Sequence, residues 1–190
     1  MPTRHLILAS ASPRRLDLLR ATGLDPEVRI PDIDESPLPG EDPTAMVERL
    51  ACAKRDAVLA SITDGVNRRV VAADTVVVLD GVVLGKPGTP GIATAMLSRL
   101  SGRTHHVVTG VAVSGPADTA STTVSTEVTW RALSSAEIAT YVATGEPLDK
   151  AGGYGIQGGG ADFVTSLIGS RDNVIGLPVT TALDLLARVS

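Results

Sequence analysis

The chain has 190 residues with a formal net charge of −4, and 43% of its residues are hydrophobic. This length suits one domain, or one domain with two lobes, and the acidic balance argues against duplex nucleic-acid binding, which needs a basic face. Aromatic residues make up only 2%, so the core must consist of Val, Leu, Ile and Ala, which favours an α/β fold.

The cysteine content and the hydropathy of the chain indicate in which cellular compartment the protein is found. Cys52 is the single cysteine, so neither an intramolecular disulfide nor a cysteine metal cluster can form. No apolar run approaches the length of a transmembrane helix, and the apolar residues near the N-terminus are too few for a signal peptide. We therefore expect a cytoplasmic protein that does not enter a membrane.

The first half of the chain predicts alternating strands and helices. The apolar run 5–9 indicates a buried strand, and Ser12-Pro13 indicates a helix that ends at Gly23, with Ser12 as its N-cap. Apolar periodicity and β-branched runs predict the elements that follow: a strand at 28–30, a Pro-rich acidic loop at 31–43, a helix at 43–60, and a hairpin of 70–79 and 82–84 around Asp80-Gly81.

The second half continues this mixed order. A capping box, Ser134-Ser-Ala-Glu137, predicts a helix that runs to about residue 143. The other elements predicted here are a helix at 92–100 closed by Gly102, strands at 105–113, 121–131 and 162–168, and a last helix at 178–189. We expect a single domain over 1–190, with a mixed twisted sheet, flanking helices and two lobes around a cleft.

The segment Ser10-Ala-Ser-Pro-Arg-Arg15 indicates a phosphate site between a strand and a helix. A helix N-terminus offers unpaired N–H groups and the positive end of the helix dipole. Ser10 and Ser12 add hydroxyl groups, while Arg14 and Arg15 add guanidinium donors suited to phosphate oxygens. Because cations at a helix start oppose the dipole, two arginines there indicate a bound anion. The alternative is a capped surface helix with two solvated arginines.

Asp74 is the strongest catalytic candidate, since it interrupts the apolar run Val-Val-Ala-Ala-Asp-Thr-Val-Val-Val-Leu. A carboxylate is costly to bury unpaired, so it requires a cation, a metal ion or a polar site. It could activate a water as general base, directly or with a divalent metal. The alternative is a solvated acid at a bulge or strand end, capped by Thr75.

Three charged residues from separate segments are further candidates for the functional site. Lys54 lies on the apolar stripe of the helix at 43–60, so its ammonium either reaches past the core to solvent or enters a binding site. Lys86, directly after the predicted hairpin, could reach phosphate. Glu35 lies in the Pro-rich loop, where metal binding and a solvated acidic loop are equally good interpretations.

The stretch Asp149-Lys-Ala-Gly-Gly-Tyr-Gly-Ile-Gln-Gly-Gly-Gly160 carries six glycines, which are costly in regular structure. Lys150 and Gln157 are the groups in it that could contact a ligand. The Gln amide combines an acceptor with two donors, so it can recognise the edge of uracil or thymine. The alternative to a ligand loop is a flexible hinge.

Other site types lack support. His105 and His106 point to opposite faces of a predicted strand, and no His-x-x-x-His pattern exists, so we expect no zinc site. The chain contains no P-loop pattern, and Ser10 and Ser12 lack the context of a nucleophile elbow.

Taken together, the motifs resemble the Maf family of nucleoside triphosphate pyrophosphatases. They occur in family order from Leu8 to Pro178: Leu-Ala-Ser-Ala-Ser-Pro-Arg-Arg, Ala-Ala-Asp-Thr-Val-Val, Gly-Lys-Pro, Leu-Ser-Gly-Arg-Thr-His, Asp-Lys-Ala-Gly-Gly-Tyr-Gly-Ile-Gln-Gly and Gly-Leu-Pro. The resemblance implies an α/β fold related to inosine triphosphate pyrophosphatases and, often, a homodimer. It also implies metal-dependent hydrolysis of a nucleoside triphosphate to the monophosphate and pyrophosphate, in a house-cleaning role.

The resemblance also implies roles for the residues that would carry out the hydrolysis. Asp74 matches the proton acceptor that activates a water for attack on the α-phosphorus. Lys54 and Lys86 match phosphate contacts, and Glu35 matches a metal contact beside Asp74. We therefore expect Mg²⁺ or Mn²⁺ as cofactor.

A second set of family positions is associated with the choice of substrate. By the same resemblance, Arg14, Thr75 and Gln157 match these positions. The Tyr-Gly-Ile-Gln form of the glycine loop is similar to the branch acting on dTTP and UTP. Two departures from the family pattern are Trp130, where Phe is frequent, and Arg171, where Tyr is more usual.

Two other functions stay open at this point. One is a nucleotide-binding regulator of cell division, because the family has been linked with arrest of septum formation. The other is hydrolysis of 7-methyl-GTP by the same chemistry. Modified pyrimidine nucleotides would satisfy the same motifs as dTTP and UTP.

Overall fold

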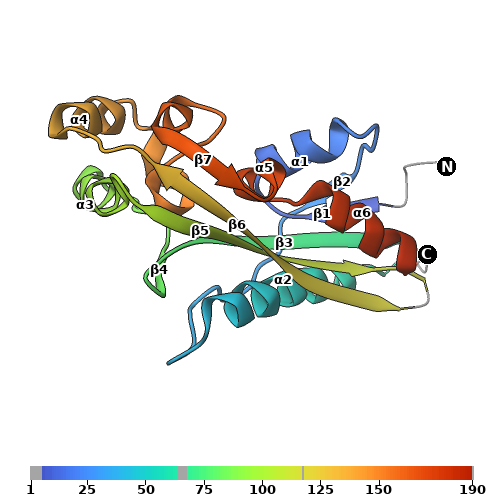
Figure 1. Ribbon diagram of the computed structural model, residues 1–190. Helices are drawn as coiled ribbons and strands as arrows, with labels where there is room; N and C mark the ends of the chain where they lie inside the picture. Colours follow the sequence, from blue (N-terminus) through green and yellow to red (C-terminus); the bar gives the residue numbers. More distant parts are fainter. Residues whose placement is uncertain (1–5, 64–67, 117, 190) are drawn as a thin grey trace. The chain divides into compact units, whose positions relative to one another are not determined.

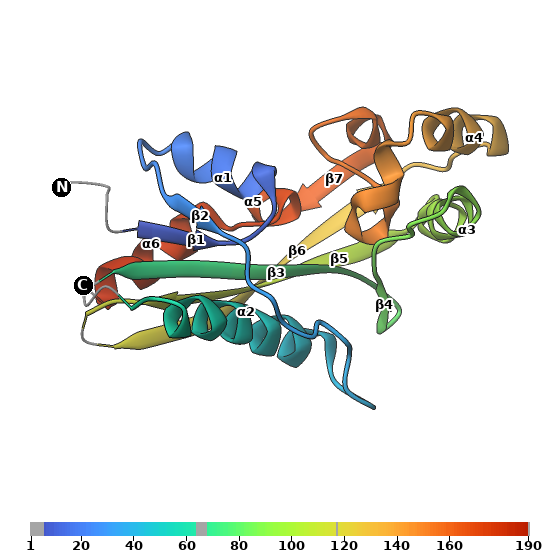
Figure 2. The same ribbon diagram turned by 180° about the vertical axis from the view of Figure 1, so that it is seen from behind.

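The computed structural model describes residues 6–63, 68–116 and 118–189 (Figures 1 and 2). Its internal contacts divide the chain into two compact units. In the described residues, the strands form one sheet of order β2-β1-β3-β5-β6-β7, with β4 paired to β3. Unit 1 contains the chain up to Asp74, then Thr109–Val124 and the C-terminal segment from Gly176; unit 2 contains Thr75–Val108 and Ser125–Ile175. The chain therefore passes between units inside strands β3, β5 and β6, and once more between Ile175 and Gly176.

Unit 1 is a βα assembly whose strands β1, β2 and β3 run parallel. Its elements are β1 (Leu6–Ala9), α1 (Pro13–Arg20), β2 (Glu27–Arg29), α2 (Pro43–Ala60), the first part of β3 (Arg69–Leu79), parts of β5 (Thr104–Ser114) and β6 (Thr119–Trp130), and α6 (Val179–Arg188). Helix α2 covers one face of this part of the sheet, and α1 and α6 cover the other (Figure 2).

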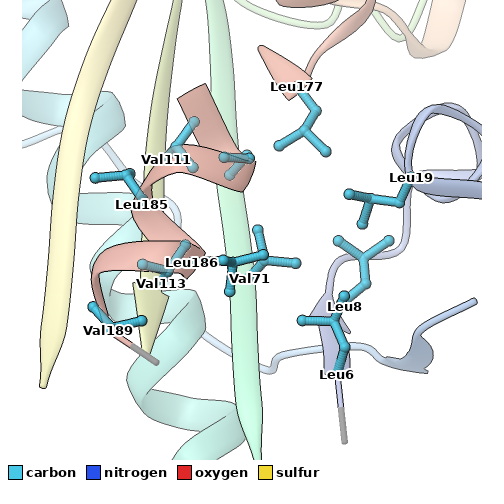
Figure 3. Close-up of a cluster of buried hydrophobic side chains, with 12 residues drawn as sticks. Leu6, Leu8, Leu19, Val71, Val111, Val113, Leu177, Leu185, Leu186 and Val189 are labelled. Atoms are coloured by element: carbon cyan, nitrogen blue, oxygen red, sulfur yellow. The ribbon is translucent and has the colours of Figure 1, made fainter. Parts of the chain in front are cut away.

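The alternation of side chains along β1 builds the core on both faces of unit 1. Leu6 and Leu8 pack toward α1 and α6, in the cluster shown in Figure 3. Ile7 and Ala9 pack on the opposite face against Val58 of α2. A strand that is buried on both faces appears in sequence as a continuous apolar run, which is why this strand was recognisable.

Unit 2 combines a hairpin with helices and a loop rich in 3₁₀ turns. Its further elements are β4 (Val82–Leu84), α3 (Pro90–Leu100), α4 (Ser135–Ala143), 3₁₀ turns at Glu146–Asp149, Ala151–Gly153 and Gly159–Phe163, β7 (Val164–Ile168) and α5 (Arg171–Ile175). Strand β4 pairs antiparallel with β3, as the Asp-Gly turn predicts, and β7 pairs antiparallel with β6.

The aromatic residues of the chain all lie in unit 2, where they form one cluster. Trp130 makes edge contacts with Tyr154 and Phe163, and Tyr141 contacts Phe163 in the same way. The buried His105 joins them, with 2.8 Å between its Nε2 and the Tyr154 hydroxyl. Burial lowers the pKa of His105 to about 4, so its imidazole is neutral at pH 7.

Most predicted elements are confirmed within a residue or two, including the capping box of α4 and the α/β class with a mixed sheet. Ser12 is the N-cap residue, but its side chain makes no capping hydrogen bond. Helix α1 ends at Arg20, before Gly23. The strand predicted from residue 162 begins at Val164, after a 3₁₀ turn, and α5 was not predicted. Residue 5 lies outside the described residues, and the cleft stays a prediction.

Candidate active site

A buried ion pair forms the centre of the candidate site in unit 1. Asp74, on β3, is only 8% exposed, and Lys54, on α2, is only 6% exposed. The Lys54 ammonium lies 2.6 Å from Oδ1 of Asp74. Lys54 is therefore turned into the protein rather than toward solvent, and it supplies the cation that a buried carboxylate requires.

Glu35 brings a second carboxylate to the same ammonium. Its Oε1 lies 2.9 Å from Nζ of Lys54, although the Glu35 side chain is 55% exposed. One buried cation is thus shared by a buried carboxylate and a solvated one. The geometry brings together three of the residues that the sequence singled out from separate segments.

Hydrogen bonds from Arg49 hold the loop that carries Glu35 against α2. The Arg49 guanidinium donates to both carboxylate oxygens of Glu41, and its Nη2 also donates to the backbone carbonyl of Ser36, at 3.2 Å. The hydrogen bond from Arg49 lowers the pKa of Glu41 to about 2. Because Ser36 directly follows Glu35, Arg49 restrains the backbone beside this carboxylate; the sequence reasoning did not identify this residue.

The turn between β1 and α1 holds Ser10 in a defined orientation. Ser10 is 4% exposed, and its Oγ accepts hydrogen bonds from the Ser12 N–H and from Nη1 of Arg15, both at 3.1 Å. With two donors on its oxygen, the hydroxyl keeps its own proton available for an acceptor such as a phosphate oxygen.

Arg15 acts here as a scaffold for this turn. Its Nε donates to the Gly176 carbonyl at 2.7 Å, in addition to its bond to Ser10. Burial lowers the pKa of Arg15, whereas the Asp74 charge opposes that shift, and arginine remains charged at neutral pH. Arg14 is half-buried next to it. Unit 1 thus gathers cations and carboxylates, the composition needed to bind a polyanion together with a metal ion.

The remaining predicted site residues belong to unit 2. Thr75 follows Asp74 on β3 and is half-buried, and Lys86 is exposed on the segment after β4. Lys150 donates to the Glu146 carbonyl and to Oδ1 of Asp149, both at 2.7 Å, so its ammonium contacts the loop itself.

The glycine loop is held by hydrogen bonds within itself and from neighbouring side chains. Gln157 is exposed on a turn closed by the bond from the Gly158 N–H to the Gly155 carbonyl, at 3.2 Å. Glu146 accepts hydrogen bonds at the centre of this loop from the Tyr141 hydroxyl and the backbone. Sequence reasoning missed both side chains, because only the folded loop brings them together.

Asp74 and Glu35 are the side chains of this site that could hold a divalent cation. Among the described ranges, no group of three or more His, Cys, Asp or Glu side chains is placed to hold a metal ion. Asp74 and Glu35 nonetheless converge on a single cation, Lys54. Mg²⁺ is commonly held by one or two carboxylates together with water and substrate phosphates, so these two residues fit.

Comparison with known proteins defines the class. Residues 5–189 match the family model described as "Maf-like protein", and the chain belongs to this family. It is 52% identical to the dTTP/UTP pyrophosphatase of Moorella thermoacetica, over 96% of this chain and 93% of that protein. It is 48% identical to the dTTP/UTP pyrophosphatase of Shewanella denitrificans, over 95% of this chain and 94% of that protein.

Among solved structures, the Staphylococcus aureus Ham1 protein has a TM-score of 0.46 and 17% identity, over 66% of this chain and 71% of that chain. None of the helices in the described residues has the length and apolar character needed to cross a membrane.

Proposed function

We propose that this chain hydrolyses dTTP and UTP to the nucleoside monophosphate and pyrophosphate, in a house-cleaning role. The convergence of Asp74 and Glu35 on the buried Lys54 ammonium carries the proposal, because it combines a general base with groups that bind a metal and phosphate. Membership of the Maf-like family and the names of relatives at 44–52% identity support the substrate class.

Asp74 is assigned as the proton acceptor. The contact with the Lys54 ammonium, 2.6 Å from Oδ1, fixes the direction of its carboxylate. Asp74 takes a proton from a water that attacks the α-phosphorus, the bond from that phosphorus to the bridging oxygen breaks, and pyrophosphate leaves. Lys54, Arg14 and Lys86 are assigned to the negative charge of the phosphates, and the Ser10 hydroxyl donates a further hydrogen bond.

We assign Asp74 and Glu35 to a divalent metal, Mg²⁺ or Mn²⁺. When bound, such an ion neutralises charge on the phosphate oxygens. We assign base recognition to Gln157 and Thr75, as the family resemblance implies. A cytoplasmic homodimer is the proposed state of the protein, from the same resemblance.

The test is pyrophosphate release from dTTP, UTP, CTP, ATP, GTP and 7-methyl-GTP, with Mg²⁺ or Mn²⁺ and with EDTA. We expect release from dTTP and UTP that EDTA abolishes. Asp74→Asn should lower kcat by about 10²-fold or more while dTTP binding persists. Asp80→Asn is the matched control, because Asp80 is exposed in the hairpin turn and pairs with Arg103.

Three outcomes would contradict the proposal. Near-normal turnover by Asp74→Asn would show that Asp74 is not the general base. Release from 7-methyl-GTP in place of dTTP and UTP would change the substrate class. Tight nucleotide binding without any product would favour a regulator over an enzyme.

A further inference from the structure

The turn that presents Gln157 is held by side chains from outside the glycine loop. The Gly155 N–H, where the turn begins, donates to the hydroxyl of Tyr141 at 3.1 Å. The Gly159 N–H, just past its end, donates to Oε2 of Glu146 at 3.2 Å. The backbone on both sides of Gln157 is therefore fixed by polar groups of α4 and of the 3₁₀ turn that follows it.

A third side chain holds the middle of the same turn. Nη2 of Arg171, on α5, donates to the carbonyl of Ile156 at 3.0 Å. Ile156 precedes Gln157 and its side chain is buried, so the peptide unit before Gln157 is anchored by packing and by a charged donor. Tyr141, Glu146 and Arg171 thus contact three consecutive parts of one short turn.

Two of these side chains also bind each other. The Tyr141 hydroxyl donates to Oε1 of Glu146 at 2.8 Å, so it is a donor to the carboxylate and an acceptor from the loop. Hydrogen bonds to a charged group are stronger than neutral ones, and chains of them reinforce one another.

Two glycines of the loop leave room for this carboxylate. A Cβ built at Gly155 would lie 2.8 Å from Oε1 of Glu146, and a Cβ at Gly158 would overlap the same carboxylate. The close approach of the Glu146 carboxylate therefore accounts for glycine at both positions without a ligand. The loop is built around the Glu146 side chain, and Gln157 projects from its exposed side.

We propose that Tyr141, Glu146 and Arg171 are positioning residues for base recognition, which act by fixing the turn that carries Gln157. The inference rests on the proposed function. An amide discriminates between bases only when its donor and acceptor are held in register with the base edge, so freedom in this turn lowers selectivity. None of the three side chains needs to touch the nucleotide for this effect.

The experiment compares kcat/KM for UTP and CTP in the wild-type protein, Tyr141→Phe, Glu146→Gln and Arg171→Leu. Tyr141→Phe keeps the ring that packs against Phe163 and removes only the hydroxyl. Loss of a side chain's hydrogen bond to the loop backbone should reduce the UTP-to-CTP ratio about two- to ten-fold, mainly through a higher KM for UTP. Partial unfolding would lower kcat for both nucleotides equally and leave the ratio unchanged.

A double-mutant cycle with Gln157→Ala tests whether the effect passes through this side chain. In that background Tyr141→Phe should have no further effect on the ratio. Thr140→Ala is the control on the same helix, since the Thr140 hydroxyl donates to the Ala136 carbonyl.

The outcomes separate the two proposals. A wild-type protein that discriminates, with an unchanged ratio in all three variants, would overturn the inference alone. Additive effects in the cycle would also overturn it. A wild-type protein that releases pyrophosphate from no nucleotide would overturn the proposed function and this inference with it.

Discussion

Substitution of Lys54 by Met would leave Asp74 buried without its cation. Removing one partner of a buried ion pair typically costs about 3–5 kcal/mol. Because half-exposed Glu35 borders the pair, water can approach it, and we expect the lower end of this range, about 3 kcal/mol. In a chain of this length such a loss lowers the melting temperature by about 6–12 °C.

The pair itself is measured by a double-mutant cycle with Asp74→Asn. The double variant buries neither charge, so it should be more stable than the sum of the single losses predicts, by about 2 kcal/mol. Urea unfolding followed by far-UV circular dichroism gives the four stabilities. Losses that add to within about 0.5 kcal/mol would show that the two side chains do not depend on each other, and would refute the reasoning.

The remaining predictions concern unit 2. Because His105 has a pKa near 4 when folded and about 6.5 when unfolded, its contribution to stability is complete above pH 6.5 and is lost progressively toward pH 4, by up to about 3 kcal/mol. His105→Gln should therefore reduce the fall in melting temperature between pH 6.5 and 5. His106→Gln changes an exposed neighbour and should keep most of that fall. The same slope in both variants would be evidence against a neutral buried imidazole. Ser134→Ala removes the hydroxyl of the capping box and should cost about 1 kcal/mol in urea unfolding, and no loss would mean that the cap does not stabilise α4. Gly158→Ala places a methyl group against the Glu146 carboxylate and should lower the free energy of unfolding by about 1–3 kcal/mol. In Gly91→Ala the new methyl group meets no atom within 4 Å, so this control should be neutral or slightly stabilising. Equal stabilities of the two variants would contradict the packing described for the loop.

The sequence predicted elements best where one local rule decides them. The buried strand at Leu6–Ala9 and the capping box at Ser134 follow from apolar runs and from a fixed spacing. Asp74 was recognised because a carboxylate within an apolar run must find a partner. Which cation would meet it depends on how α2 packs against β3, and no local pattern contains that information.

The features that were missed depend on contacts between distant residues. Helix α5 is only five residues long, too short for periodicity to reveal. The glycine loop could be interpreted as a hinge because the carboxylate that orders it, Glu146, lies outside the glycine run. Arg171 attracted notice only as a departure from the family pattern, and its contact with Ile156 gives that departure a structural role.

The gathering of all aromatic side chains in unit 2 makes the two units spectroscopically distinct. Trp130 is the single tryptophan and is buried in the aromatic cluster, so intrinsic fluorescence reports on unit 2 only. Unit 1, which holds Lys54 and Asp74, contributes backbone ellipticity but no tryptophan signal. Fluorescence therefore follows unit 2 alone, whereas far-UV circular dichroism follows the backbone of both units. Different midpoints for the two signals on one sample would show that unit 2 does not unfold together with unit 1.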